Sequence, residues 1–149
     1  MNPALRHSAA HVFVESLEAP ELHPDDAHHL FRVLRLRAGE SITVSDGRGG
    51  WRECVGAGTG LLPIGPVQHQ DAGAAITIAT SIPKGERAEW MAQKLTEVGV
   101  ARICLVHCAR SVVKWDGDRA ERQLGRLRRV VREAAMQSRQ PWLPTGSDH

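Results

Sequence analysis

The sequence predicts an α/β protein of two domains, a β-rich domain over residues 1–72 and a second domain over residues 73–149. The first half contains short segments in which apolar and polar residues alternate, as they do in strands. The second half reads as strand, helix, strand and helix, the order of a parallel α/β sheet. Between them, the Gly and Pro residues of segment 56–66 and the polar segment 69–75 interrupt regular structure, so we expect the chain to divide near residue 72.

Three strands and one short helix are predicted in the first domain. Alternation predicts strands over residues 11–17, 40–46 and 51–57, with a glycine-rich loop at 47–50. Residues 25–37 predict a helix, because Pro24 and two acidic residues stand at its start and Gly39 is placed to end it. The predicted inner stripe of this helix is Ala27, Leu30, Val33 and Leu34.

The second domain is predicted to contain strands over residues 75–81 and 102–107 and helices over residues 86–98 and 119–138. The first helix has Met91, Leu95 and Val98 at helical spacing. Its other face carries Trp90, Lys94 and Glu97, for which an ordinary Lys94–Glu97 ion pair is a better interpretation than a partner contact. In the second helix, one stripe is apolar and another is basic: Leu124, Leu127, Val131 and Ala134 against Arg122, Arg126 and Arg129.

The net charge of +2 conceals an asymmetry between the two halves. Residues 1–70 hold six Arg and eight acidic residues, whereas residues 71–149 hold thirteen basic and nine acidic residues. Arginine suits phosphate because its planar guanidinium donates several hydrogen bonds at once. For Arg32, Arg35 and Arg37 a phosphate contact and a solvated helix face are equally good interpretations, and for the basic stripe of the last helix the solvated face is slightly favoured.

Three cysteines, Cys54, Cys104 and Cys108, are an odd number without the spacing of a disulfide framework, so we expect free thiols in the cytoplasm. A metal site is not expected, because strand alternation turns His107 away from Cys104 and Cys108. No apolar run approaches the roughly 20 residues that cross a bilayer, so no membrane association is expected.

Several spaced motifs run along most of the chain. In the first domain they are His28, His29, Leu30, Arg32, Val33, Leu34 and Arg35, then Gly39, Asp46, Gly47, Gly49 and Gly50. In the second they are Pro83, Lys84, Gly85, Arg87, Glu89, Trp90, Gln93, Lys94, Glu97, Gly99 and Val100, then Arg110, Ser111 and Val112, and then Glu133, Ala134, Ala135, Gln137, Ser138 and Pro144. In this order they resemble the RsmE-type family of 16S ribosomal RNA (uracil-N3) methyltransferases of the SPOUT superfamily.

The resemblance implies an N-terminal PUA-like β-barrel that contacts RNA, followed by the N-terminal part of a SPOUT-type α/β methyltransferase domain. It implies S-adenosylmethionine as cofactor, N3-methylation of a uridine in 16S rRNA, the small ribosomal subunit as partner and a possible homodimer. The family's "GPEGG" and "LR-ETA" cofactor motifs do not occur in these 149 residues. We therefore expect the cofactor-binding residues beyond residue 149, expect this chain to be inactive alone, and assign no catalytic residue.

Eleven polar residues are candidates for substrate or RNA binding. They are Arg32, Arg35, Arg37, Lys84, Lys94, Arg110, Arg122, Arg126, Arg129, Gln137 and Arg139. Gln140 stands where relatives usually carry an Arg. Two alternatives stay open: a non-catalytic RNA-binding module or truncated inactive relative, and a small α/β protein whose arginines only solubilise it.

Overall fold

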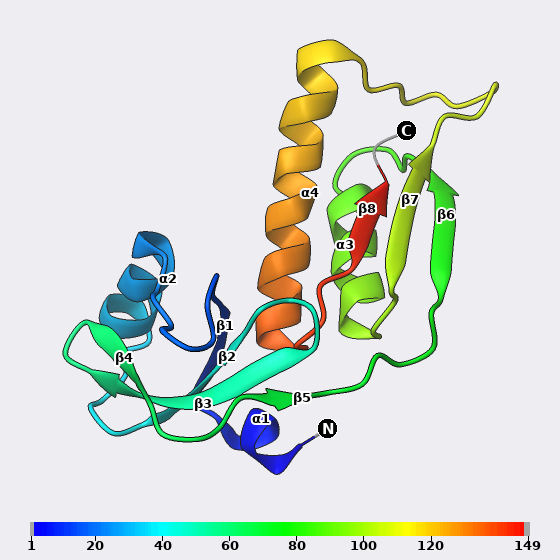
Figure 1. Cartoon of the computed structure of the whole chain (residues 1–149). Helices are drawn as coiled ribbons and strands as arrows, with labels where there is room; N and C mark the ends of the chain where they lie inside the picture. Colours follow the sequence, from blue (N-terminus) through cyan, green and yellow to red (C-terminus); the bar gives the residue numbers. More distant parts are fainter. Residues whose placement is uncertain (1, 148–149) are drawn as a thin grey trace. The chain divides into compact units, whose positions relative to one another are not determined.

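A computed structural model describes residues 2–147 and divides the chain into two units between Asp71 and Ala72 (Figure 1). The first unit contains the following elements in chain order: α1 (Pro3–His7), β1 (Ala10–Phe13), α2 (Pro24–His28), the π-helix η1 (His29–Val33), β2 (Ser41–Ser45), β3 (Gly50–Ala57), β4 (Gly60–Pro63) and β5 (Gln68–His69). Its strands form one sheet in the order β1-β2-β3-β4, with β5 also paired to β3. Only β1 and β2 run parallel; the other described pairs are antiparallel.

The core of the first unit lies on β1, β2 and β3. Val12, Ile42, Val44 and Trp51 are almost completely buried there. His11, buried in the same core, has its Nδ1 atom 2.8 Å from the hydroxyl of Thr43, which in turn lies 3.1 Å from the hydroxyl of Ser8. Buried polar groups are tolerated only when hydrogen-bonded, so this chain of contacts fixes β1 against β2.

Segment 56–66 departs from the prediction, because β4 forms in place of the expected interruption. It pairs antiparallel with β3 from Cys54↔Pro63 to Ala57↔Gly60. Gly58 has a φ of +64°, a backbone conformation that glycine adopts without strain and that reverses the chain between the two strands. Pro63 ends an edge strand, where its missing N–H breaks no interior ladder. The glycines of this segment therefore form part of a β-hairpin, where an interruption of regular structure was predicted.

The helix predicted over residues 25–37 is wrong in its length and in its inner face. The α-helix ends at His28, and a π-helix continues to Val33 with a hydrogen bond of 2.9 Å from the Leu34 N–H to the His29 C=O. Leu30 is buried as expected, but Val33 and Leu34 are 58% and 51% exposed. The wider five-residue spacing rotates them away from the face that Leu30 occupies. The helix also ends before Gly39, since Arg35 takes a left-handed φ of 52°.

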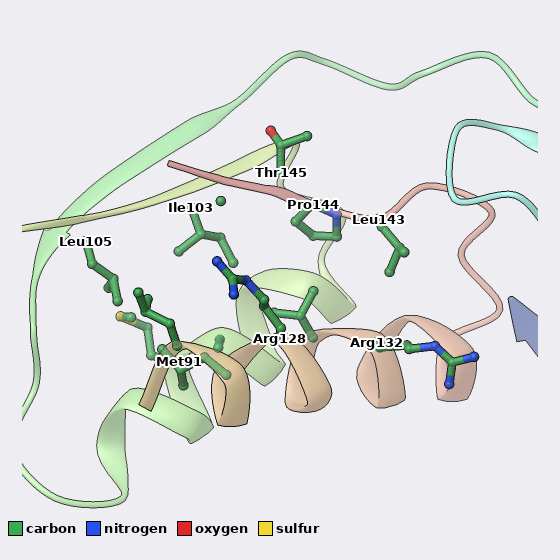
Figure 2. Close-up of a pocket in the computed structure, with 13 residues that line it drawn as sticks. Met91, Ile103, Leu105, Arg128, Arg132, Leu143, Pro144 and Thr145 are labelled. Atoms are coloured by element: carbon green, nitrogen blue, oxygen red, sulfur yellow. The ribbon is translucent and has the colours of Figure 1, made fainter. Parts of the chain in front are cut away.

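The second unit is a parallel three-stranded sheet with two helices. Its elements are β6 (Thr77–Ser81), α3 (Arg87–Glu97), β7 (Arg102–Val106), α4 (Gly117–Gln137) and β8 (Thr145–Ser147), and the strand order is β6-β7-β8. Both helices lie on the same side of this sheet (Figure 2). The strand–helix–strand–helix prediction is confirmed, and β8 is a strand that the sequence did not predict.

Alanines allow the two helices to approach each other. Ala88 and Ala92 of α3 are buried together with Leu127 of α4. The apolar stripe predicted for α4 is confirmed, with Leu127 and Ala134 fully inside. The stripe predicted for α3 is wrong at Val98, which is 75% exposed because it lies just past the last helical turn.

Replacing Gly50, which lies in the turn that opens β3, is predicted to destabilise the fold. A Cβ atom there would lie 2.6 Å from Oδ2 of Asp46 and 2.8 Å from Cδ1 of Leu17. Asp46 cannot move freely, because its Oδ1 accepts hydrogen bonds from the N–H groups of Arg48 and Gly50. Gly50→Ala is expected to lower the free energy of unfolding by about 1–3 kcal/mol in urea denaturation.

Gly60→Ala is the matched control for this prediction. It lies in the neighbouring strand, and the nearest atom to a Cβ there is 3.8 Å away. Equal unfolding midpoints for the two variants would contradict the steric argument.

Candidate nucleic-acid interface

The segment from His29 to Arg37 presents three cationic side chains from the first unit. Arg32, Arg35 and Arg37 are exposed, and no carboxylate among residues 2–147 forms an ion pair with any of them. The backbone beneath them is held in place, since the N–H of Arg37 donates to Glu40 Oε2 at 2.7 Å and the N–H of Glu40 donates back to the Arg37 C=O. The structure therefore brings these three predicted residues together on a fixed backbone with unneutralised charge.

This segment is anchored on β3. Leu30 is buried, and a Cβ atom at Gly56 would contact Phe31 and Leu36, each at 3.5 Å. The N–H of Gly39 also donates to the C=O of Gly56 at 3.3 Å. A glycine at residue 56 lets the helical segment lie close to the strand.

Lys84 and Arg110 lie in the loops that follow two neighbouring parallel strands. β6 ends at Ser81, which is paired with Val106 at the end of β7, so both loops begin at the carboxyl edge of the sheet. Both side chains are exposed and have no acidic partner among the described residues. Arg110 lies in a turn that is closed by a hydrogen bond of 2.9 Å from the Ser111 N–H to the Cys108 C=O. Ligands of open α/β sheets bind at this edge.

The basic stripe of α4 is partly engaged with α3. Arg122 and Arg129 are exposed, whereas Nε of Arg126 lies 2.8 Å from Oε1 of Glu89. The Arg126 side chain remains 57% exposed, so this pair adds little stability, on the order of 0–1 kcal/mol. Arg126 thus connects the two helices, and Arg122 and Arg129 keep their full charge toward solvent.

Lys94 forms the ordinary ion pair that its spacing predicts. Its Nζ lies 2.8 Å from Oε2 of Glu97, and Nε2 of Gln93 donates to the other carboxylate oxygen at 2.8 Å. Hydrogen bonds from Lys94 and Gln93 lower the pKa of the Glu97 carboxyl. The charge of Lys94 is therefore already paired within its own helix.

Arg139 caps the end of α4. It has a left-handed φ of 58°, and its Nη1 donates to the C=O groups of Met136 and Gln137 at 3.3 and 3.4 Å. Burial lowers the pKa of its guanidinium. Gln140 has a similar role, since its Nε2 donates to the Glu97 C=O at 3.2 Å and so connects the ends of the two helices. Gln137 is exposed beside them.

A cavity of about 320 Å³ lies between the helices and the sheet of the second unit. Aliphatic side chains from α3, β7 and α4 line it, and its charged lining residues among those described are Arg128 and Arg132. Figure 2 shows the Arg128 head group directed toward Ile103 and Pro144 and that of Arg132 directed away from them. Neither arginine is among the predicted site residues, and the helical period places both between the apolar stripe and the basic stripe of α4.

This cavity does not fit S-adenosylmethionine. The cofactor carries a cationic sulfonium, an ammonium and ribose hydroxyl groups, which call for carboxylate or carbonyl acceptors, and a single carboxylate, which a guanidinium can bind. Its described lining contains two cations and no carboxylate. Burying the sulfonium among these aliphatic side chains, with no carboxylate in the described lining to accept its charge, is unfavourable.

Metal binding and membrane insertion find no support in residues 2–147. Nowhere in that range do three or more His, Cys, Asp or Glu side chains gather closely enough to hold an ion. None of its helices is long and apolar enough to span a bilayer.

Two family comparisons cover both units and define the class of protein. Residues 70–148 match the family described as RNA methyltransferase domain, and residues 22–55 match the family described as RNA methyltransferase PUA domain. A small mixed-sheet unit followed by a parallel α/β unit is thus the architecture of an RNA methyltransferase with a PUA domain.

Curated relatives identify the family more narrowly. Ribosomal RNA small subunit methyltransferase E of Mycobacterium tuberculosis is 35% identical over an alignment of 130 residues, and the match covers 80% of this chain and 48% of the relative. The enzyme of that name from Bacillus subtilis is 28% identical, over 83% of this chain and 51% of the relative. The chain belongs to the RsmE-type family of ribosomal RNA methyltransferases. It spans about half the length of these curated relatives.

Solved structures agree with this assignment. Ribosomal RNA small subunit methyltransferase E from Neisseria gonorrhoeae, bound to S-adenosyl methionine, superimposes with a TM-score of 0.76 and 28% identity, over 95% of this chain and 62% of that one. A probable rRNA-methyltransferase from Porphyromonas gingivalis gives a TM-score of 0.73 and 28% identity, over 92% of this chain and 58% of that one.

Removal of Lys94 is predicted to raise the pKa of Glu97. In Lys94→Met the carboxyl loses its first hydrogen-bond donor, so its pKa should move upward toward the ordinary value in an NMR titration. A lowered folded-state pKa stabilises the fold above the unfolded pKa, and that contribution disappears as pH falls through the folded value. Lys114→Met, which removes an exposed lysine from a distant loop, is the control; an unchanged Glu97 titration in the Lys94 variant would refute the pairing.

Proposed function

We propose that this chain recognises ribosomal RNA as part of an S-adenosylmethionine-dependent methyltransferase that modifies N3 of a uridine in the 16S rRNA of the small subunit. Membership of the RsmE-type family supports the proposal, and its relatives are ribosomal RNA small subunit methyltransferases. For a protein with this substrate we expect a cytoplasmic location, because small ribosomal subunits are assembled there.

One observation carries the RNA-binding part of the proposal. Arg32, Arg35 and Arg37 expose three unpaired guanidinium groups within six residues of a fixed backbone. Unneutralised charge on an ordered segment is suited to a polyanion, because the backbone entropy is already lost before binding and each guanidinium can donate to phosphate oxygens in pairs. Lys84 and Arg110 offer a second pair of cations at the sheet edge.

Methylation at N3 requires the uracil to be held with its imide nitrogen in line with the methyl donor and to lose the N3 proton. S-adenosylmethionine supplies the methyl group in this chemistry. The described cavity does not fit that cofactor, so we assign the residues of this chain to holding the RNA and assign no step of methyl transfer to them.

The cavity also favours a second candidate function. A chain that binds RNA without binding the cofactor would be a non-catalytic RNA-binding module, and the absence of a carboxylate from the described lining of the cavity supports this candidate. We further propose that the chain forms a homodimer, for which the described sheet edges at β6 and β8 are candidate contacts, since exposed strand edges can pair with another chain. A single monomeric species in sedimentation velocity at high protein concentration would refute the dimer.

RNA binding is predicted to depend steeply on salt, with Arg32 and Arg37 responsible for part of the slope. For single strands each phosphate contact contributes roughly 0.7 to the slope of log K against log[salt], so Arg32→Gln/Arg37→Gln should reduce it by about 1.4. Fluorescence anisotropy with a hairpin from small-subunit rRNA measures this.

The matched control is Arg6→Gln/Arg48→Gln, which removes two exposed arginines from the same unit outside the segment. Equal slopes for the two double variants would show that the segment has no special role, and absence of wild-type binding at low salt would refute the RNA function itself.

Calorimetric titration of this chain with S-adenosylmethionine is predicted to show no saturable binding. The physical reason is that the described lining of the cavity is largely aliphatic and offers no carboxylate to a cationic ligand. Sinefungin, a cofactor analogue in which a primary amine replaces the sulfonium, serves as a parallel ligand and should also fail. One-to-one binding of either would disprove our assignment of the cavity.

A further inference from the structure

Val33 and Leu34 form an exposed apolar pair that the fold does not use. Val33 and Leu34 are 58% and 51% exposed, whereas Leu30, three residues before Val33, is almost completely buried. Their sequence spacing is that of an inner helical stripe, and an uninterrupted α-helix would have placed them near the face of Leu30. The structure instead turns both outward.

Two backbone features produce this outward rotation. The Leu34 N–H donates to the C=O of His29, five residues earlier, and the Leu36 N–H donates to the C=O of Leu30 at 3.0 Å. Arg35 between them adopts a left-handed φ of 52°. A π-helical turn and a left-handed non-glycine residue are both unfavourable locally, and such features occur often at functional sites.

The apolar pair is surrounded in sequence by cations. Arg32 precedes it, Arg35 follows it and Arg37 is two residues further on; segment 29–37 contains no acidic residue, and none of the three guanidinium groups has a described acidic partner. An aliphatic ridge with phosphate-binding groups on either side matches a strand in which an unstacked base lies between two backbone phosphates.

We propose that Val33 and Leu34 contact an unpaired base of single-stranded or looped RNA while Arg32, Arg35 and Arg37 bind the flanking phosphates. This rests on the proposed RNA-binding function and adds the form of RNA that is recognised. In an A-form duplex the bases are stacked and their faces covered, so an aliphatic ridge finds no apolar partner there. An unstacked base offers its apolar face, which side chains can cover without reading its sequence.

The test compares two double variants of the full chain. Val33→Ser/Leu34→Ser removes the ridge and retains every arginine. Leu62→Ser/Ile64→Ser removes an apolar pair of the same unit that is equally exposed, 55% and 54%, and has no charged residue in the segment from Gly60 to Val67. Anisotropy titrations use an RNA hairpin with an unpaired loop and a fully paired RNA duplex of the same length.

The ridge variant is expected to bind the looped hairpin about tenfold more weakly than wild type, with the salt slope and the duplex affinity unchanged. The Leu62/Ile64 variant is expected to bind both RNAs as wild type does. Because the Val33 and Leu34 side chains are exposed, melting temperatures should not change; the single variant Leu34→Ser gives an independent measurement with a smaller effect in the same direction.

Three results overturn the proposal. If the ridge variant binds the hairpin as wild type does, no base contacts the ridge. If it loses affinity equally for hairpin and duplex, the ridge does not select unpaired RNA. If instead it abolishes a concentration-dependent dimer seen in sedimentation, the ridge is a contact between copies of the chain. Failure of wild type to bind either RNA is a separate outcome, which refutes the RNA-binding function on which this inference depends.

Discussion

The hydrogen bond between the Leu34 N–H and the His29 C=O determines which surface the first unit presents. Its five-residue spacing separates Leu30, which anchors the segment in the core, from Val33 and Leu34, which face solvent. Arg35, the next residue in the chain, has a left-handed backbone conformation. Phe31 and Leu36 lie against Gly56 and so hold the π-helix and the turn at Arg35 on β3. Three exposed arginines therefore project from a segment whose backbone is held by hydrogen bonds, so a ligand of these arginines would not have to order that backbone on binding.

The arginines of the second unit serve several physical purposes. Arg126 joins α4 to α3 through Glu89, and Arg139 caps the C-terminus of α4. Only Arg122 and Arg129 of the predicted stripe keep their charge toward solvent without an acidic partner among the described residues. A basic composition alone therefore overstates the cationic surface, and the pairing of each guanidinium decides whether it is available to phosphate.

Periodicity predicted the elements whose packing is regular. The alternation of strand and helix in the second unit and the inner stripe of α4 at Leu127 and Ala134 are confirmed, because an uninterrupted α-helix on a parallel sheet follows its 3.6-residue period. The Lys94–Glu97 pair was also foreseen, since it is a local contact.

Features that depend on tertiary context were missed. The apolar spacing of Leu30, Val33 and Leu34 fits an α-helix, and nothing in it signals a change to five-residue hydrogen bonding. Gly58 and Pro63 predict an interruption by their residue types, whereas in the structure Gly58 turns a hairpin and Pro63 ends an edge strand. Arg139 caps α4 with a left-handed backbone conformation, which a non-glycine residue does not reveal in the sequence. The family motifs marked several of these residues without indicating which of them are structural.

The central claim is that the segment from His29 to Arg37 binds RNA. The most direct test is photo-crosslinking of the full chain to a small-subunit rRNA hairpin, followed by mass spectrometry of the crosslinked peptides. Crosslinks should concentrate in that segment, include Val33 or Leu34, and disappear with an excess of unlabelled hairpin. Crosslinks that avoid residues 29–37 and fall only on the outer face of α4 would contradict the account, because the backbone geometry around Leu34 would then have no part in RNA recognition.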